Sequence, residues 1–246
     1  MKTLSPFRFR FFALNAILCL SVWACNAPSQ AGADGAAATR TAGGSSAEFV
    51  DLLAGGSTAA WRNYKADTIS HQWEVVDGVL GLAGKGGGDI ITREVYENFD
   101  LELEWKISPK SNSGIFFHVA EPDSLGRVYH SGPEIQILDN DGHPDGKITT
   151  HRSGDNYDLQ ASTVETVKPV GEWNQMRIVV NQGRVEQWLN GTLVVEYQLG
   201  SPEWEAQYQA SKFTQWPLYG RAGKGHIALQ DHGDLVWFRN IRVKTL

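Results

Sequence analysis

The stretch Phe99-Asp-Leu-Glu-Leu-Glu-Trp-Lys-Ile107 holds the clearest strand pattern in the chain. Its odd-numbered positions are all apolar, and its even-numbered positions are all charged. Successive side chains of a strand point to opposite faces, so this alternation predicts an antiparallel sheet with one face in the core and one in water. We expect Trp105, together with Trp173 further along the chain, to lie in the core. Glu102 and Glu104 are expected at the surface.

Short strands separated by turns extend from this stretch in both directions. Asp77-Gly78 and Asn190-Gly191 are typical two-residue hairpin turns. The last strand needs a bulge near Arg239–Asn240 if Phe238 and Ile241 are both to point inward. About a dozen strands, no internal repeat and one weak helical pattern predict a single all-β sandwich of the jelly-roll type. The other strand segments are residues 73–82, 89–93, 112–119, 134–138, 173–197, 225–233 and 236–243.

A carboxylate and a carboxamide share one face of the strand within His130-Ser-Gly-Pro-Glu-Ile-Gln-Ile-Leu-Asp-Asn140. Ile135 and Ile137 point to the other face, which we expect in the core. Glu134 and Gln136 would cost stability if buried without partners, so they fit a wet cleft or a satisfied network. A solvated outer face of a sandwich strand explains them equally simply.

Three other segments carry polar groups that suit a site. Alternation over residues 112–119 places His118 beside Phe116, on the face opposite Ile115, Phe117 and Val119. Near the C-terminus, Gln230 and His232 share a face opposite Ile227 and Leu229. Residues 139–163 form a long polar segment, and long loops in compact domains are often functional. Its candidate side chains are His143, His151 and Tyr157, of which the two histidines lack helical metal-ligand spacing.

Charge and cysteine content exclude several classes of protein. The net charge is −6, and the first 24 residues hold three basic and no acidic residues, so the remainder carries −9. So acidic a domain is a poor candidate for nucleic-acid binding. Both cysteines, Cys19 and Cys25, lie near the N-terminus, so the rest of the chain has no disulfide framework and no cysteine-based zinc site.

The N-terminus has the pattern of a targeting segment. Lys2, Arg8 and Arg10 precede an apolar run too short and interrupted for a typical membrane span. Val22-Trp-Ala-Cys25 resembles a bacterial lipoprotein signal, in which the cysteine is lipidated after cleavage at residue 24. An ordinary secretory signal is the alternative. Residues 25–47 then form a flexible tether, and 48–246 the domain, which we expect in the periplasm or at the cell surface with the lipid as its only membrane contact.

Several separated motifs carry a resemblance to a known family, covering roughly residues 49–246. The chain resembles the 3-keto-disaccharide hydrolases, formerly a domain of unknown function. The resemblance implies a concanavalin A-like jelly roll of two antiparallel sheets. Characterised members of this family cleave glycosides already oxidised to a ketone at carbon 3. The motifs are residues 73–80, Asn112-Ser-Gly-Ile-Phe116, Glu134-Ile-Gln-Ile-Leu-Asp139, Pro169-Val-Gly-Glu-Trp-Asn174, Trp188-Leu-Asn-Gly191, residues 225–233 and Val236-Trp-Phe-Arg-Asn-Ile241.

The chemistry that this resemblance implies needs three kinds of group. A ketone at C3 acidifies the C2 hydrogen, so a base can remove it, and the enolate then expels the group at C1. The site needs that base, an electrophile for the enolate oxygen and an acid for the leaving oxygen. Glu134 is the candidate base or metal ligand, and the electrophile is His232, Arg239 or a divalent cation. His151 and Tyr157 are candidate acids. Candidate substrate-binding residues are Gln136, Gln230, Tyr157, Asn112 and His118.

Two other functions fit the same residues. Glu134, Gln136 and Asp139 have the spacing of the catalytic strand of retaining glucanases with this fold, although strict alternation turns Asp139 to the opposite face. Non-catalytic, lectin-like sugar binding would need only exposed aromatic side chains. Incubation with 3-keto-glycosides and with their unoxidised parents separates these possibilities.

Overall fold

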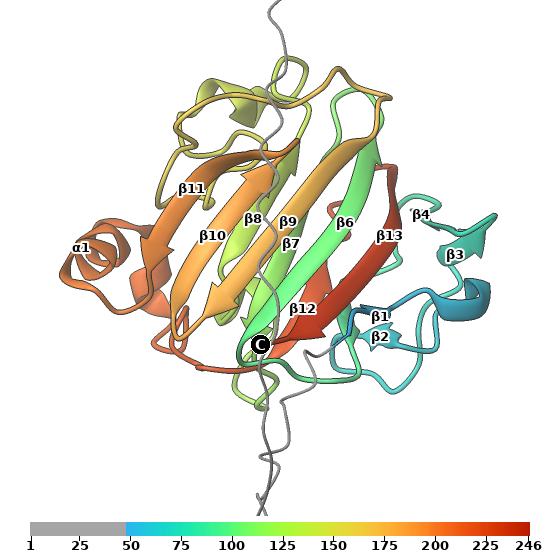
Figure 1. Cartoon of the computed structure of the whole chain (residues 1–246), viewed down its shortest axis with the longest axis horizontal. Helices are drawn as coiled ribbons and strands as arrows, with labels where there is room; N and C mark the ends of the chain where they lie inside the picture. Colours follow the sequence, from blue (N-terminus) through green and yellow to red (C-terminus); the bar gives the residue numbers. More distant parts are fainter. Residues whose placement is uncertain (1–47) are drawn as a thin grey trace, which may run out of the picture. The chain divides into compact units, whose positions relative to one another are not determined.

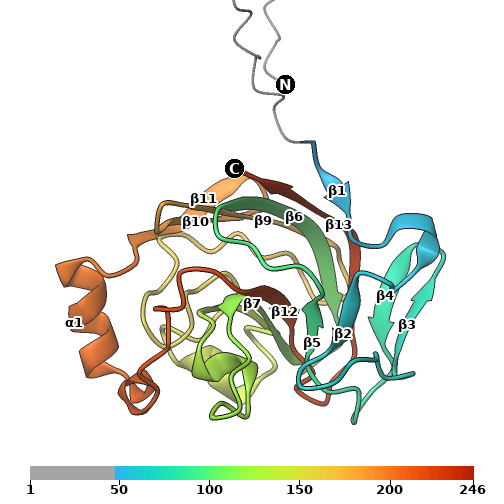
Figure 2. The same cartoon turned by 90° about the horizontal axis from the view of Figure 1, so that it is seen from below.

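The computed structural model describes residues 48–246, which form two antiparallel sheets packed face to face (Figures 1 and 2). One sheet has the order β11-β10-β9-β6-β13-β4-β3, with β1 also paired to β13, and the other has the order β2-β5-β12-β7-β8. We call them the large and the small sheet. The predicted jelly-roll sandwich is confirmed. Strands of the large sheet are β1 (Val50–Asp51), β3 (Trp73–Val76), β4 (Val79–Leu82), β6 (Phe99–Ile107), β9 (Asn174–Asn181), β10 (Arg184–Leu189), β11 (Thr192–Gln198) and β13 (Val236–Thr245).

The small sheet carries the polar strand predicted to matter. Its far side, away from the large sheet, faces loops (Figure 2), and Val128 from one of them packs against it. Its strands are β2 (Trp61–Asn63), β5 (Ile90–Thr92), β7 (Asn112–Val119), β8 (Glu134–Leu138) and β12 (His226–Leu229). The short helices are η1 (Ala54–Gly56), η2 (Val128–His130), η3 (Pro144–Lys147), α1 (Pro202–Ala210) and η4 (Lys212–Gln215). No helix among the described residues is long and apolar enough to cross a membrane.

The core lies between the sheets and follows the predicted alternation. All five apolar residues of β6 are buried, including Trp105, which is 1% exposed. Ile135 and Ile137 of β8 are buried in the same apolar cluster. The apolar faces of β6 and β8 therefore point at each other across the sandwich, and the other face of β8 points to the loops.

Turns and bulges occur where the sequence predicts them. Asp77 and Gly78 both have positive φ, 51° and 77°, which matches the right-handed twist of the β3–β4 hairpin. The register between β13 and β6 shifts between Arg239 and Arg242. This bulge keeps Phe238 and Ile241 both buried, as expected.

Residues 139–163 lie along the free edge of β8. The backbone N–H of Gln136 donates to the Asp155 carbonyl at 3.1 Å, and that of Tyr157 donates to the Glu134 carbonyl at 3.0 Å. The loop thus covers an edge strand whose backbone groups would otherwise be unpaired, and it is fixed next to Glu134.

Trp173 is not in the core, contrary to expectation. It precedes β9 on the outer face of the large sheet, where the Arg239 guanidinium lies 4.1 Å from its ring centroid and the Lys106 ammonium 5.0 Å. The side chain is half-buried. Stacking with cations satisfies a tryptophan at a surface where burial is incomplete.

Candidate active site

A row of side chains crosses the small sheet on the face away from the core. Gln136 of β8 pairs with Gly114 of β7, and the Gln230 N–H donates to the Gly114 carbonyl at 3.0 Å. The next pair along, Leu229 with Ile90, places Asp89 beside Gln230. Residues directly opposite each other in a sheet share a face, so Asp89, Gln230 and Gln136 lie in one row. Gly114 leaves a position without a side chain between Gln230 and Gln136.

Glu134 lies over that bare position. A Cβ atom at Gly114 would collide with the Glu134 carboxylate, and would stand only 3.0 Å from its Cδ. The carboxylate therefore lies over β7 at Gly114, and Gln230 pairs with Gly114 from the other side. This brings together three of the predicted residues, Glu134, Gln136 and Gln230. Glycine is required here because of the close approach of the carboxylate.

Burial makes the Glu134 carboxyl an unusual acid. The residue is 6% exposed, and within the described chain its carboxylate has no hydrogen-bonded protein partner. Burial raises its pKa to about 8, with the nearby Lys212 charge opposing the shift and Asp89 adding to it. Burial likewise raises the pKa of Asp89 to about 6, and this carboxylate accepts the Asp231 N–H at 3.0 Å. Two carboxyl groups with raised and different pKa values are typical of an active site.

The loop residues His151 and Tyr157 meet at the edge of β8 next to Glu134. Their ring centroids are 4.2 Å apart, and His151 Nε2 lies 3.1 Å from Asp158 Oδ1. The Lys212 ammonium donates to the Tyr157 hydroxyl oxygen at 3.0 Å. Burial raises the pKa of Tyr157, which stays a neutral phenol near neutral pH.

Three buried amide atoms on this face have no partner in the described chain. They are Gln136 Nε2, Gln230 Oε1 and Asn112 Oδ1. Asn112 lies two residues from Gly114 on β7 and so shares its face. Buried polar atoms are almost always hydrogen-bonded, so these three fit the hydroxyl groups of a ligand.

His232 lies beside His143 of the segment that follows β8. It is exposed, and its ring is 6.4 Å from that of His143, centroid to centroid. Among the described residues, no three His, Cys, Asp or Glu side chains are grouped to hold a metal ion. Nothing in this part of the chain therefore identifies residues for the divalent cation considered above.

Arg239 and His118 do not reach the site, which corrects two predictions. Arg239 lies on the outer face of the large sheet, where its guanidinium pairs with Glu104. His118 has a φ of +51°, and the register of β7 with β12 shifts beside it. This bulge turns its ring toward Phe99 and Phe117, while Val119 joins Phe116 on the other face. His118 Nε2 bonds the Glu97 carbonyl at 2.8 Å, which is a structural contact.

Asp139, the second carboxylate of the glucanase pattern, is held in a turn. Its oxygens accept the backbone N–H groups of Lys110, Asp141 and Gly142. Burial alone would raise its pKa, but these donors lower it. Its two oxygens are thus both engaged in closing the loop after β8.

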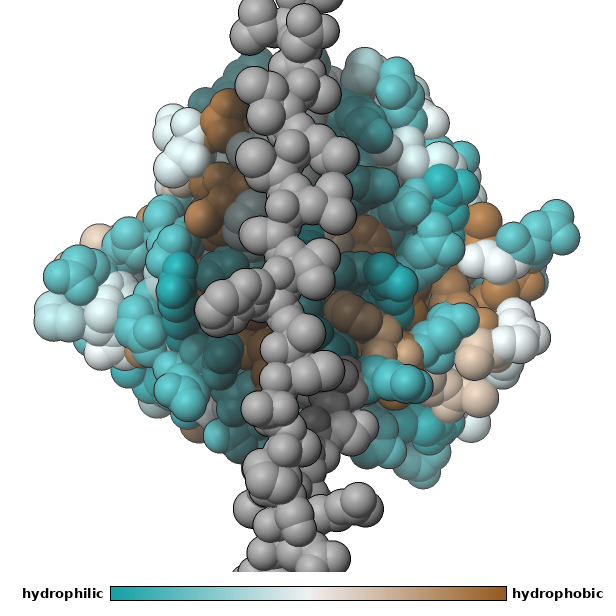
Figure 3. Space-filling view, in the orientation of Figure 1, coloured by the Kyte–Doolittle hydropathy of each residue, from teal (hydrophilic) through white to brown (hydrophobic). Residues whose placement is uncertain are grey.

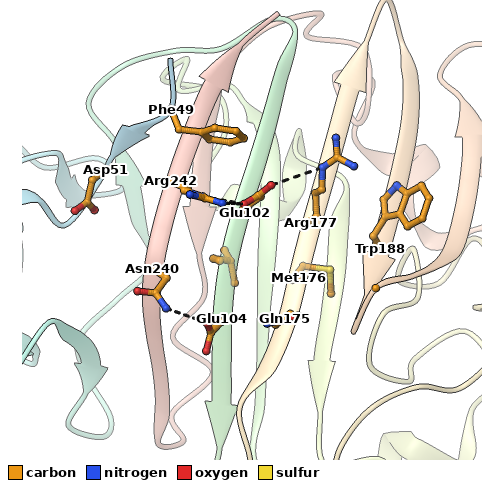
Figure 4. Close-up of a pocket in the computed structure, with 12 residues that line it drawn as sticks. Phe49, Asp51, Glu102, Glu104, Gln175, Met176, Arg177, Trp188, Asn240 and Arg242 are labelled. Atoms are coloured by element: carbon orange, nitrogen blue, oxygen red, sulfur yellow. Dashed lines mark hydrogen bonds and ion pairs between the residues drawn. The ribbon is translucent and has the colours of Figure 1, made fainter. Parts of the chain in front are cut away.

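A different hollow lies on the outer face of the large sheet (Figure 4). Glu102 stands between Arg242 and Arg177, and Asn240 donates to Glu104, so these side chains satisfy one another. Apolar side chains gather beside β3 and β4 (Figure 3), where Val76, Val79, Leu235 and Trp237 line a hollow of about 350 Å³. Neither hollow contains buried carboxylates or unpartnered amides, so the small sheet is the better candidate site.

Asp89, Gly114 and Lys212 were not predicted from the sequence. Asp89 immediately precedes the short apolar strand β5, and its relation to Gln230 depends on the pairing of Ile90 with Leu229, which is 139 residues away. Gly114 lies within the motif Asn112–Phe116, but its role becomes visible only from the position of the Glu134 carboxylate. Lys212 belongs to a short helix whose sequence shows no site pattern.

Comparisons with known proteins agree with this fold. Residues 48–244 match the family described as the 3-keto-alpha-glucoside-1,2-lyase-like domain. The chain is 40% identical over 227 residues to a 3-keto-disaccharide hydrolase of Bacteroides thetaiotaomicron, covering 80% of this chain and 78% of that protein.

Solved structures from Parabacteroides distasonis show the same fold. One, described as a candidate glycosyl hydrolase, is 31% identical, with a TM-score of 0.74 over 80% of this chain and 94% of that one. A second is 29% identical, with a TM-score of 0.61 over 81% and 100%. The family match and the 40% identical relative together show that this chain belongs to the 3-keto-alpha-glucoside-1,2-lyase-like family.

Proposed function

We propose that the domain cleaves the glycosidic bond of 3-keto-glycosides, by removal of the C2 proton, elimination and addition of water. The observation that carries this proposal is the Glu134 carboxyl, which is buried, lies over Gly114 and has a pKa raised to about 8. A base that takes a proton from carbon works best when its pKa is near the working pH. Membership of the family supports the substrate class.

The steps balance with the residues present. Glu134 takes the proton from C2, the C2–H pair becomes a C2=C3 bond, and the C3 carbonyl pair moves onto oxygen. The carbonyl then re-forms, a C1=C2 bond appears, and the C1–O bond breaks with its pair on the leaving oxygen. Water adds at C1, and the proton that it loses makes up for the one taken by the released oxygen. The protonated Glu134 carboxyl exchanges with this water and returns a proton to C2. Gln136, Gln230 and Asn112 supply unpartnered amide atoms for the sugar hydroxyls.

An ordinary glycosidase mechanism needs two carboxylates placed around the bond. Asp139 is committed to a turn, which weakens the glucanase version of that mechanism. Asp89 is a half-buried carboxyl on this face, with a pKa raised to about 6. An unoxidised substrate tests this second function directly.

The deciding experiment incubates the purified domain with 3-keto-glucosides and their unoxidised parents, with and without a chelator. Cleavage of only the oxidised sugars supports the proposal, and cleavage of the parents supports an ordinary glycosidase. Saturable binding without cleavage of either supports a lectin-like role. Glu134→Gln keeps the shape of the side chain, and we expect it to lower turnover at least about 10²-fold, the low end for a general base.

A further inference from the structure

The proposed elimination needs a proton donor for the leaving oxygen, and the loop beside β8 offers one. Tyr157 is fixed to the strand of Glu134 itself, because its backbone N–H donates to the Glu134 carbonyl at 3.0 Å. Its hydroxyl lies 3.0 Å from the Lys212 ammonium. The two groups come from segments 55 residues apart, so their contact is a product of the fold.

The direction of this hydrogen bond follows from the chemistry of the two groups. A lysine ammonium has three N–H donors and no acceptor, so the Tyr157 oxygen must accept. The phenolic proton is then free to be donated elsewhere. The positive charge of Lys212 beside the Tyr157 oxygen also stabilises the phenolate that would remain after donation.

Surrounding side chains hold this pair in place. The Tyr157 ring packs on His151, with centroids 4.2 Å apart, and edge-on against Phe213. Asp158 contacts both His151, at 3.1 Å, and the Lys212 ammonium, at 3.9 Å. Lys212 is the first residue of η4, after the capping residue Ser211. Neighbouring residues therefore hold both Tyr157 and Lys212 in place beside Glu134.

We propose that Tyr157 gives its phenolic proton to the leaving glycosidic oxygen, and that Lys212 is the positioning residue that stabilises the resulting phenolate. The O–H bond of Tyr157 breaks, its electron pair stays on the phenolate oxygen, and the proton joins the oxygen released from C1. The incoming water restores the phenol when it loses a proton. This inference rests on the proposed function and adds Lys212, which no sequence pattern suggests.

The test uses two substrates that differ in whether the leaving oxygen must be protonated as it departs. The leaving oxygen of a 3-keto-disaccharide departs as an alkoxide unless it is protonated, whereas that of a p-nitrophenyl 3-keto-glucoside departs as a stable anion. On the plateau of each pH profile, we expect Tyr157→Phe and Lys212→Met to lower kcat for the disaccharide about 10²-fold, as for general acids, and for the nitrophenyl substrate by less than about threefold. Lys212→Arg should keep most of the activity, and Lys224→Met, an exposed lysine, is the matched control.

Other outcomes separate the possible failures. If Lys212→Met slows the cleavage of both substrates equally, or of neither, the proposed roles of the Tyr157–Lys212 dyad are wrong even though the proposed function stands. If the wild type cleaves neither oxidised substrate, the proposed function is wrong. A measurement without substrate then still tests the dyad: NMR titration of ring-labelled tyrosine should show a higher pKa for Tyr157 in Lys212→Met. An unchanged pKa would overturn the inference.

Discussion

Glu134 is held in an environment that opposes its charge. It is 6% exposed, the Lys212 charge offsets only part of the effect of burial on its pKa, and Asp89 adds a repulsion. Proteins rarely keep such a group unless the site uses it. The cost of this arrangement depends on pH and is measurable.

Replacement of Glu134 by glutamine should stabilise the fold at high pH. The native pKa, about 8, lies above the ordinary value of 4.5, so the folded state keeps a proton that the unfolded state loses. Stability is therefore full below pH 4.5 and falls as the pH rises through about 8. We expect Glu134→Gln to match the wild type at pH 4 and to exceed it by a few kcal/mol at pH 9, since one pKa unit is about 1.4 kcal/mol. Urea unfolding at both pH values measures this, and equal stabilities at pH 9 would contradict it.

The Asp89 charge should influence the pH dependence of activity, because it adds to the effect of burial on the pKa of Glu134. If Glu134 is the base, kcat/KM for a 3-keto-glucoside rises with pH and levels off above about 8. Burial is the main cause of that pKa, and the Asp89 charge raises it further. Asp89→Asn should therefore move the inflection to lower pH. An inflection that stays in place would show that the two carboxyl groups are not coupled.

Strand β7 contributes to the site at Gly114, where the absence of a side chain leaves room for the Glu134 carboxylate. A methyl group at Gly114 would collide with the Glu134 carboxylate. Because a misplacement of about 1 Å can cost about 10²-fold in rate, we expect Gly114→Ala to lower turnover by about that factor with the fold intact. Gly126→Ala is the matched control, since its added methyl group would meet nothing within 4 Å. Kinetics and far-UV circular dichroism distinguish displacement from unfolding.

The two faces of β6 should respond differently to truncation. Trp105 is 1% exposed, so Trp105→Ala should cost about 3–5 kcal/mol of unfolding free energy. Glu104 pairs with Arg239 and Asn240 on the outer face, and such pairs are worth about 0–1 kcal/mol. Denaturant titration of both variants measures these costs, and comparable losses would mean that the outer face contributes as much as the core.

Alternation along single strands predicts most of the fold but less of the site. It places the cores of β6 and β8 and the outward direction of Glu134 and Gln136 correctly. It fails at His118, where a bulge breaks the period of two, and at Trp173, which precedes its strand. The role of Asp89 depends on which strands pair, and that of Lys212 on where a helix packs. Neither is encoded in a local pattern.

At the scale of the whole molecule, the site and the outer face of the large sheet lie on opposite sides of the sandwich. The large sheet presents ion pairs, and the small sheet presents the buried Glu134 carboxyl, the half-buried Asp89 carboxyl and unpartnered amides. On the outer face of the large sheet the charged side chains pair with one another, whereas the outer face of the small sheet offers polar atoms that a ligand could bind.

Attachment through Cys25 stays a prediction, because Cys25 and residues 1–47 lie outside the described residues. We propose a lipid-anchored protein of the periplasm or cell surface on the basis of the basic leader, the apolar run and Cys25. Cys25→Ser should release the domain into soluble fractions of a bacterial host. Retention in the membrane with an uncut leader would indicate a transmembrane anchor instead.

The central claim is that Glu134 removes the proton from C2, and the most direct measurement follows that hydrogen. A 3-keto-glucoside is cleaved in D₂O, and the product is analysed by NMR for deuterium at C2, with subtraction of the exchange seen without enzyme. Elimination and hydration predict deuterium at C2 in step with cleavage by the wild type, and neither process with Glu134→Gln. Cleavage by the wild type that leaves the original hydrogen at C2 would contradict the account.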